Sequence, residues 1–178
     1  YVNVDGLNLN YKVYDNPEAN IITTAYGSIR IYSGMMDMLS DDELLAVIST
    51  QIGHLANKDV RDALLKVASE DNATKAGGAQ LEKLLSFSGD KLGSVVNELL
   101  QVPYTDDQNK KADTYAYDLL KTNGTDTKAL VSALTKFAEL EAADKAAADS
   151  EEGEVSAASK FIGVNSNNAL RASLISSK

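Results

Sequence analysis

The sequence has no cysteine, no tryptophan and one histidine, His54. Without cysteine, neither a disulfide nor a thiolate metal site can form. No stretch approaches the roughly 18 continuous apolar residues of a membrane-spanning helix, so we expect no transmembrane segment in this chain. A catalytic zinc ion usually takes three protein ligands from His, Cys and carboxylates. Any zinc site here would therefore need at least two carboxylates beside His54.

Positive charge is also scarce, since the formal net charge is -9. Nucleic acids and anionic membrane surfaces require a basic face, so the charge argues against both as main partners. Hydrophobic residues make up 44% of the 178 residues, which is enough for a core. We therefore predict one soluble globular domain over residues 1–178.

The N-terminal part, residues 1–33, has the alternation of apolar and polar residues that is typical of strands. Leu9, Tyr11 and Val13 alternate with polar residues, which predicts a half-buried strand. Ile29 and Ile31 repeat the pattern and predict a strand paired with the first. The β-prone residues 20–24 between them are a candidate third strand.

From residue 34 to residue 178 the apolar spacing becomes helical. Ser40 and Glu43 form a capping-box pattern, and so do Thr105 and Gln108, so each pair predicts the start of a helix. The first of these helices carries apolar residues on more than one side, which predicts that it is buried. Further helices are expected at 60–67, within 81–100, at 127–145 and after 167–168, with a mobile loop near 146–158. The predicted fold class is α+β, a short N-terminal sheet followed by a mostly helical domain.

The segment Thr-Gln-Ile-Gly-His at 50–54 resembles the zincin helix motif HExxH, in which two histidines one turn apart share a zinc ion. Its flanks are similar to the HtpX and CAAX-prenyl-protease-like gluzincin zinc metallopeptidases. The similar segments are residues 20–37, 39–44, 105–113 and 161–171, and the resemblance runs in order from Tyr11 to Arg171. It implies a zincin-like fold in which the buried helix is of the active-site type.

The same resemblance shows where this chain departs from the family's motif. The first histidine is replaced by Thr50, the general-base glutamate by Gln51 and the third ligand, a glutamate, by Asn109. A neutral hydroxyl is a poor zinc ligand, and an amide cannot deprotonate a water molecule. Val164 stands where the family has a histidine. His54 is the one surviving ligand position, so we expect no bound zinc or other cofactor and no functioning catalytic residue.

Two other matching positions are Asp113 and Arg171, which the resemblance places under the old active centre. We expect them to support it as an ion pair. Lys110 and Lys111 follow Asn109, and two interpretations exist: a lysine that fills the vacated metal position, or two solvated helix lysines. The second is favoured.

The functional prediction is a catalytically inactive metallopeptidase-like domain, a pseudopeptidase, that binds a peptide or partner protein in the old cleft. By analogy with zincins, a peptide would pair with an edge strand near residues 27–32. The alternative is an active zinc metalloendopeptidase with a non-standard ligand set, in which Asp106, Asp107 or Asp113 would join His54. An enzyme of another class has no nucleophile–base pair or phosphate loop to support it.

The family's habit also gives an expectation for localisation. Its members are often associated with the cell envelope. The chain begins at Tyr1 without a basic or apolar leader. We therefore expect a bacterial periplasmic, envelope or secreted protein whose signal or anchor has been removed.

Overall fold

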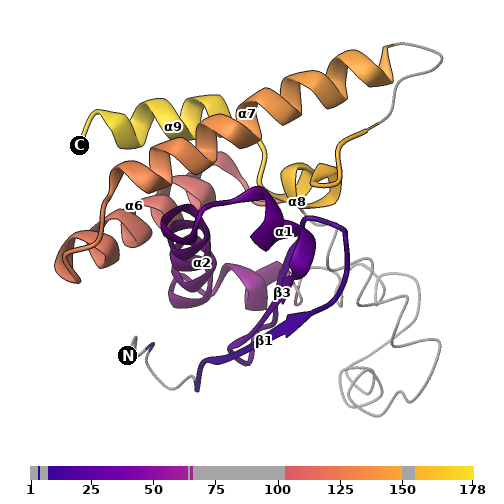
Figure 1. Cartoon of the computed structure of the whole chain (residues 1–178). Helices are drawn as coiled ribbons and strands as arrows, with labels where there is room; N and C mark the ends of the chain where they lie inside the picture. Colours follow the sequence, from indigo (N-terminus) through magenta and orange to yellow (C-terminus); the bar gives the residue numbers. More distant parts are fainter. Residues whose placement is uncertain (1–3, 5–7, 64, 66–102, 150–154) are drawn as a thin grey trace, which may run out of the picture.

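A computed structural model describes residues 4, 8–63, 65, 103–149 and 155–178. Within these residues a small sheet lies along one side of a group of packed helices (Figure 1). All three strands precede the first helix in the chain. The predicted α+β class, with a short N-terminal sheet followed by helices, is therefore confirmed.

The sheet has three strands: β1 (Asn10–Tyr14), β2 (Ile21–Thr23) and β3 (Ser28–Tyr32), in the order β1-β3-β2. β3 pairs in parallel with β1 and antiparallel with β2, which confirms the predicted pairing and the third strand. The expectation that the segment near residues 27–32 forms an edge strand is wrong, because β3 lies in the middle. The edge strand beside the long buried helix is β2.

The predicted half-burial of the first strand is also wrong, since all five residues of β1 are exposed. Tyr11 lies opposite Ile29 and Val13 lies opposite Ile31, so these side chains share one face of the sheet. Ile29 and Ile31 are buried on that face, whereas Tyr11 is 45% and Val13 57% exposed. The apolar face of the sheet therefore continues onto β1, beyond the part that is buried.

The long buried helix α2 (Asp41–Ala56) follows the short helix α1 (Ser33–Met38). Both bonds of its capping box are present: Ser40 Oγ accepts from the Glu43 amide, and the Glu43 carboxylate accepts from the Ser40 amide. Every residue from Ser49 to Leu55 is buried, as predicted for a helix with apolar residues on several sides. This burial places residues 50–54 inside the molecule.

Four more helices are α6 (Asp106–Thr122), α7 (Lys128–Ala148), α8 (Ser159–Val164) and α9 (Asn168–Ser176). The predicted capping box at Thr105 is also complete. α2 packs against α6 and α7, and α7 packs against α9. One apolar core joins the sheet to α2, α7 and α8, and a second lies among α2, α6, α7 and α9.

The predicted boundaries can be compared with the structure in two places. Residues 59–63 are helical, in agreement with the start of the helix expected at 60–67. Most of the rest of that helix, and all of the helices expected within 81–100, lie outside the described residues. The loop expected near 146–158 is shorter, because α7 continues to Ala148 and Ala158 is buried. None of the helices in the described ranges has the length and apolar character to cross a membrane.

Candidate functional site

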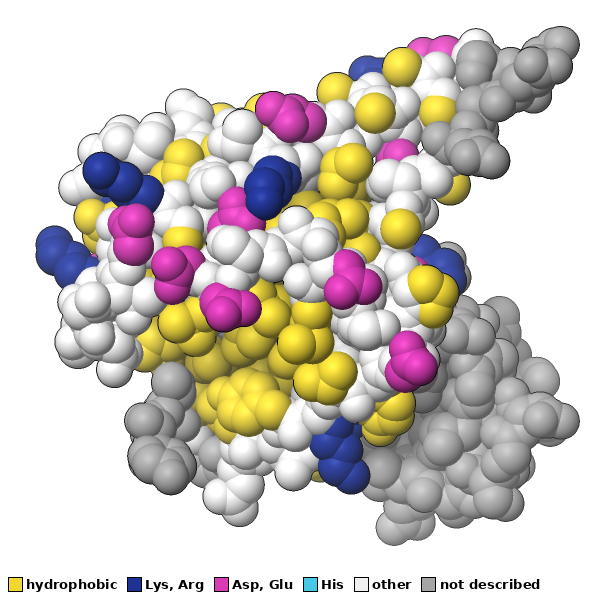
Figure 2. All heavy atoms as spheres, in the orientation of Figure 1, with side chains coloured by type: hydrophobic (Ala, Val, Ile, Leu, Met, Phe, Trp, Pro, Cys, Tyr) yellow, Lys and Arg dark blue, Asp and Glu magenta, His cyan; other side chains and the backbone are white. Residues whose placement is uncertain are grey.

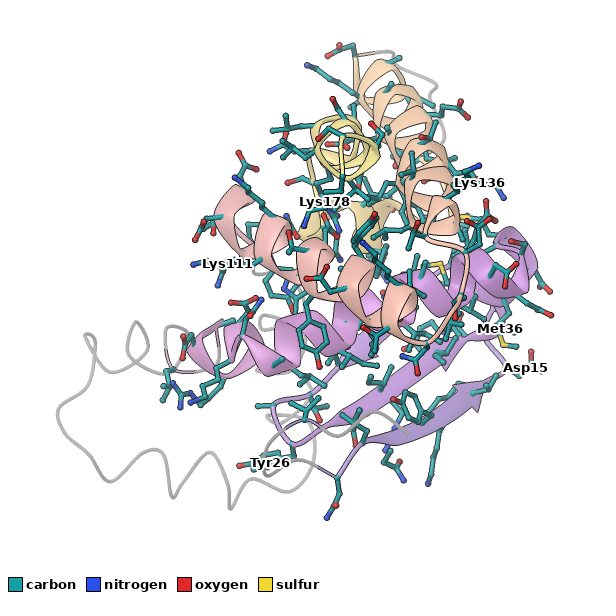
Figure 3. All side chains as sticks on the ribbon, turned by 90° about the vertical axis from the view of Figure 1, so that its left-hand side faces the viewer. Asp15, Tyr26, Met36, Lys111, Lys136 and Lys178 are labelled. Atoms are coloured by element: carbon teal, nitrogen blue, oxygen red, sulfur yellow. The ribbon has the colours of Figure 1, made fainter. Side chains whose placement is uncertain are left out.

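The site lies where α2 and α6 cross at close range (Figure 3). Gly53 allows this approach, because a Cβ at that position would lie 2.6 Å from the carbonyl oxygen of Ala112. On each helix two site positions follow at a spacing of four residues: Thr50 and His54 on α2, and Asn109 and Asp113 on α6. The crossing brings both pairs into the interior, and all four residues are buried.

His54 is fully buried and is held by two neighbours that are not on its own helix. Its Nδ1 lies 2.9 Å from Oδ2 of Asp59. Its ring stacks on that of Tyr104, with centroids 3.7 Å apart and an angle of 12° between the planes. Burial lowers the pKa of His54 below its ordinary value, although Asp59 acts in the opposite direction. Burial thus favours the neutral imidazole, and in the tautomer whose Nδ1–H donates to the Asp59 carboxylate, Nε2 carries the lone pair.

Nε2 of His54 has no hydrogen-bond partner in the described structure, and neither does either polar atom of the Asn109 amide. Both residues are 0% exposed. A buried polar group without a partner costs about 1–3 kcal/mol, so such groups are usually satisfied by water or a ligand. Three unpaired polar atoms at His54 and Asn109 make this region the candidate site.

Thr50 and Gln51 take the remaining motif positions. The Thr50 hydroxyl lies 3.4 Å from the Ala46 carbonyl oxygen and 3.4 Å from Oδ1 of Asp113, so its contacts are within the protein. The Gln51 Oε1 accepts a hydrogen bond of 3.0 Å from the Thr23 hydroxyl of β2. Its Nε2 is buried and has no partner among the described residues. Gln51 thus connects the edge strand to α2, and both N–H groups of its amide are unpaired among the described residues.

A cavity of about 50 Å³ opens beside Gln51. A water molecule requires roughly 10–15 Å³ measured in this way, so the cavity has room for a few water molecules or one small polar group. On its far side Asn165 donates from Nδ2 to the Phe161 carbonyl, and its Oδ1 has no partner among the described residues. The other lining residues come from β2 and its approach, the helical residues 59–63, Tyr104 and α8: Asn20, Ile21, Thr23, Val60, Ala63, Lys160, Phe161 and Val164.

Asp113 and Arg171 form a two-pronged ion pair directly behind Thr50. Nε of Arg171 donates to Oδ2 of Asp113 and Nη2 donates to Oδ1, both at 2.8 Å. Nη1 donates to the Asn165 carbonyl and to Oδ1 of Asn168. The pair is buried, with 6% of the arginine and 1% of the aspartate side chain exposed. It connects α6, α9 and the Asn165 segment that lines the cavity.

The remaining charged candidates point away from the site. Asp107 and Lys111 pair with each other on the surface at 2.6 Å, and Lys110 is exposed (Figure 3). The interpretation of a lysine that fills the metal position is therefore wrong, and the two lysines are solvated. Asp106 is also exposed, with Asn167 as its partner.

The donor atoms at the site do not fit a zinc ion. His54 Nε2 is available, but Thr50 and Asn109 offer neutral oxygens, and Asp59 and Asp113 are engaged with His54 and Arg171. In the ranges that the structure describes, no three His, Cys, Asp or Glu side chains gather in a way that could hold a metal. Catalytic zinc needs three such ligands.

Sequence reasoning missed two residues of the site. Asp59 is the hydrogen-bond partner of His54. Its position five residues after His54, just past the helix end, was the available signal. Tyr104 stacks on His54 from the segment before α6. No local pattern at Tyr104 could have indicated that contact.

A buried helix that carries Thr-Gln-Ile-Gly-His at 50–54, crossed by a second helix and flanked by an edge strand, is consistent with the zinc-metallopeptidase class of fold. Peptidase family M48 matches residues 9–173, and the chain belongs to that family. The predicted resemblance and the zincin-like fold are thereby confirmed.

Two curated relatives come from Escherichia coli (strain K12). The chain is 36% identical to metalloprotease LoiP over 140 residues and 32% identical to metalloprotease YcaL over 143 residues. Each alignment covers 78% of this chain and 55% of the relative, so the chain spans about half the length of these relatives. No solved structure matches.

Proposed function

We propose that this domain does not hydrolyse peptide bonds and instead binds an extended peptide or partner-protein segment in the cleft between β2 and α2. The observation that carries the proposal is the neutral state of the site. Each group at the old ligand and base positions, Thr50, Gln51, His54 and Asn109, is buried and uncharged. A neutral, buried set of donors and acceptors suits peptide groups, which are themselves neutral and carry both an N–H and a C=O group.

The polar atoms at the cavity match such a ligand. Gln51 Nε2 can donate to a peptide carbonyl, and Asn165 Oδ1 can accept from a peptide N–H. β2 lies at the edge of the sheet, where an extended peptide can add as a further strand. Because Gln51 also accepts from Thr23 of β2, its side chain is oriented relative to that edge. The relatives' names describe metalloproteases, and peptides are the class of molecule that this chain would retain as ligands.

An active zinc endopeptidase with a non-standard ligand set is the second candidate. The names of the two relatives describe metalloproteases, which favours this candidate. Against it stand the positions of its candidate ligands. Asp106 and Asp107 are exposed, and Asp113 is bound to Arg171. A place in the bacterial envelope or periplasm remains a proposal that rests on the family resemblance.

A metal-binding experiment with a restored variant separates the two candidates. The wild-type protein and the variant Thr50→His/Gln51→Glu/Asn109→Glu are titrated with zinc, and bound metal and cleavage of an unstructured protein substrate are measured. We expect no stoichiometric zinc and no cleavage for the wild type, and zinc binding for the variant. The proposal would be overturned if the wild type bound stoichiometric zinc and cleaved the substrate, and if His54→Ala abolished that cleavage.

Peptide binding is tested with a displayed library of random peptides. We expect peptides selected on the wild type to bind about 10-fold more weakly to Gln51→Met, because one buried hydrogen bond contributes about 1.4 kcal/mol. Asn165→Leu should weaken the same peptides. Selected peptides that bind both variants as tightly as the wild type would contradict binding in the cleft.

A further inference from the structure

A second surface lies on a different side of α2 from the cleft. It is an apolar groove with a volume of about 320 Å³, in the range of small ligand-binding sites. We call it the β1 groove, after the strand on one of its sides. Figure 2 shows this apolar surface as a hollow, with acidic side chains along its upper margin. Its lining residues are Tyr11, Leu45, Ile48, Ser49, Ile52, Leu119, Leu120, Asn123 and Thr125.

The β1 groove shares no lining residue with the cavity beside Gln51. At about 100° per residue, positions 45, 48 and 52 point roughly 60–120° around α2 from Gln51, the α2 residue that lines that cavity. The groove is therefore separate from the cleft of the proposed function, and the inference below does not depend on that function.

The groove exists because the apolar face of the sheet extends past the helices that cover it. Tyr11 and Val13 share a face with the buried Ile29 and Ile31, yet both are about half exposed. Leu45 of α2 is also 43% exposed at the groove. Large exposed apolar side chains that adjoin one another on strand and helix mark an interaction surface.

Charge identifies the kind of partner. Asp41 and Asp42 lie four and three residues before Leu45, so they continue the lining face of α2 by one turn. Asp126 follows the lining residue Thr125. All three are exposed, and none has an ion-pair partner within the described residues. The ends of the groove are therefore acidic.

Two cations near the groove, Lys12 and Lys121, are directed elsewhere. Lys12 lies between Tyr11 and Val13 on β1, so its side chain points to the opposite face of the sheet. Lys121 of α6 lies 5.8 Å above the ring of Tyr117. The chain as a whole carries a net charge of -9, which opposes association with a second copy of itself.

β1 also determines the conformation of the partner. It is the edge strand at the end of the sheet opposite β2. A strand that adds to β1 would direct every second side chain onto the face that bears Tyr11 and Val13. We propose that the β1 groove binds an extended, positively charged peptide segment whose alternate residues are apolar. Its apolar side chains occupy the groove, and its basic side chains pair with Asp41, Asp42 and Asp126.

The experiment uses the full chain and a short fluorescent peptide of alternating lysine and valine. Peptides of alternating glutamate and valine, and of alternating lysine and serine, serve as comparisons. We expect the lysine–valine peptide to bind at least about 10-fold more tightly than either, a difference of about 1.4 kcal/mol. Its affinity should fall as salt is added, because exposed charges are screened.

Two groove variants and two matched controls locate the binding. Leu45→Gln removes an apolar contact, and Asp41→Asn/Asp42→Asn removes two charges. We expect each variant to weaken binding about 3- to 10-fold. The charge variant should also make the affinity less dependent on salt. Leu174→Gln, on an exposed residue of α9, is the control for Leu45→Gln. Glu139→Gln/Asp149→Asn removes two exposed charges from α7 and its C-cap and is the control for Asp41→Asn/Asp42→Asn. Both controls should leave binding unchanged. Circular dichroism checks that each variant is folded, and Gln51→Met, a cleft variant, should also bind normally.

Three results would overturn the proposal. One is equal binding of the lysine–valine and glutamate–valine peptides. Another is an equal loss of binding in the groove variants and their controls. The third is a dimer, seen by sedimentation, that Leu45→Gln dissociates, since the groove would then bind a second copy of the chain. If a groove variant fails to fold, the lysine–valine peptide is titrated into the wild type instead, and the amide chemical shifts that change locate its binding site. Changes on β1 and α2 are expected.

Discussion

Replacing Arg171 by methionine tests whether the buried ion pair behind the site stabilises the fold. The guanidinium donates two hydrogen bonds of 2.8 Å to Asp113, one to the Asn165 carbonyl and one to Asn168. Methionine fills much of the same volume but donates none of them. The Asp113 carboxylate, whose side chain is 1% exposed, would then be buried without a compensating charge.

The expected loss follows from this geometry. Removing one partner of a buried, hydrogen-bonded ion pair costs about 3–5 kcal/mol in the free energy of unfolding. For a domain of this size, each kcal/mol lowers the melting temperature by about 2–4 °C. We therefore expect Arg171→Met to melt roughly 6–20 °C below the wild type. Urea denaturation followed by circular dichroism measures the same loss as a free energy.

Two further variants make the test specific. Asp113→Leu/Arg171→Met removes the uncompensated charge along with its partner and should recover part of the stability. Arg61→Met is the matched control, because Arg61 and its partner Asp62 are 55% and 54% exposed and such a pair contributes at most about 1 kcal/mol. The reasoning is refuted if Arg171→Met costs no more than Arg61→Met, or if the double variant is no more stable than Arg171→Met.

Three other predictions follow from individual contacts. Gly53→Ala should destabilise the fold by about 1–3 kcal/mol, because its Cβ would clash with Ala112. Gly163→Ala is the control, because a Cβ there meets open space, and it should not destabilise the fold. Chemical denaturation measures both losses. Burial would raise the pKa of Glu43, but hydrogen bonds from Lys136, Ser132 and Ser40 lower it from 4.5 to about 2. The stability that wild type has over Glu43→Gln should therefore be complete above pH 4.5 and disappear as the pH falls toward 2, measured by unfolding at each pH. Burial lowers the pKa of His54. Its ring signals, which are the only histidine signals of the chain, should therefore titrate with a midpoint below pH 6.5 in NMR spectra. A midpoint above pH 6.5 would contradict a neutral site.

The parts of the fold that local rules determine could be predicted from the sequence. Ser40 with Glu43 and Thr105 with Gln108 satisfy amide groups within their own first turns, so the starts of α2 and α6 were evident without any tertiary contact. The four-residue spacing of Thr50 and His54 places both on one face of a helix regardless of its surroundings.

What depended on long-range packing could not be predicted in the same way. The alternation of Tyr11 and Val13 indicates a two-faced strand correctly, but whether a helix covers that face is decided by where α2 packs. The last helix was expected to follow residues 167–168, and α9 does begin there, directly after its N-cap residue Asn167. Its side chain makes no cap bond, because Glu141 of α7 accepts from the Asn167 and Asn168 amides instead.

The departures from the family's motif are coupled in electrostatic terms under the proposed function. A zinc ion would compensate the charge of anionic groups at positions 51 and 109, which are 3% and 0% exposed. Without the ion, carboxylates at such depth would be uncompensated charges, each costing several kcal/mol. Gln51 has the size of a glutamate and Asn109 is one methylene shorter; both amides form hydrogen bonds but carry no charge. Under the proposed function, loss of the metal and loss of the acids would favour each other, and the site would stay polar and neutral instead of becoming apolar.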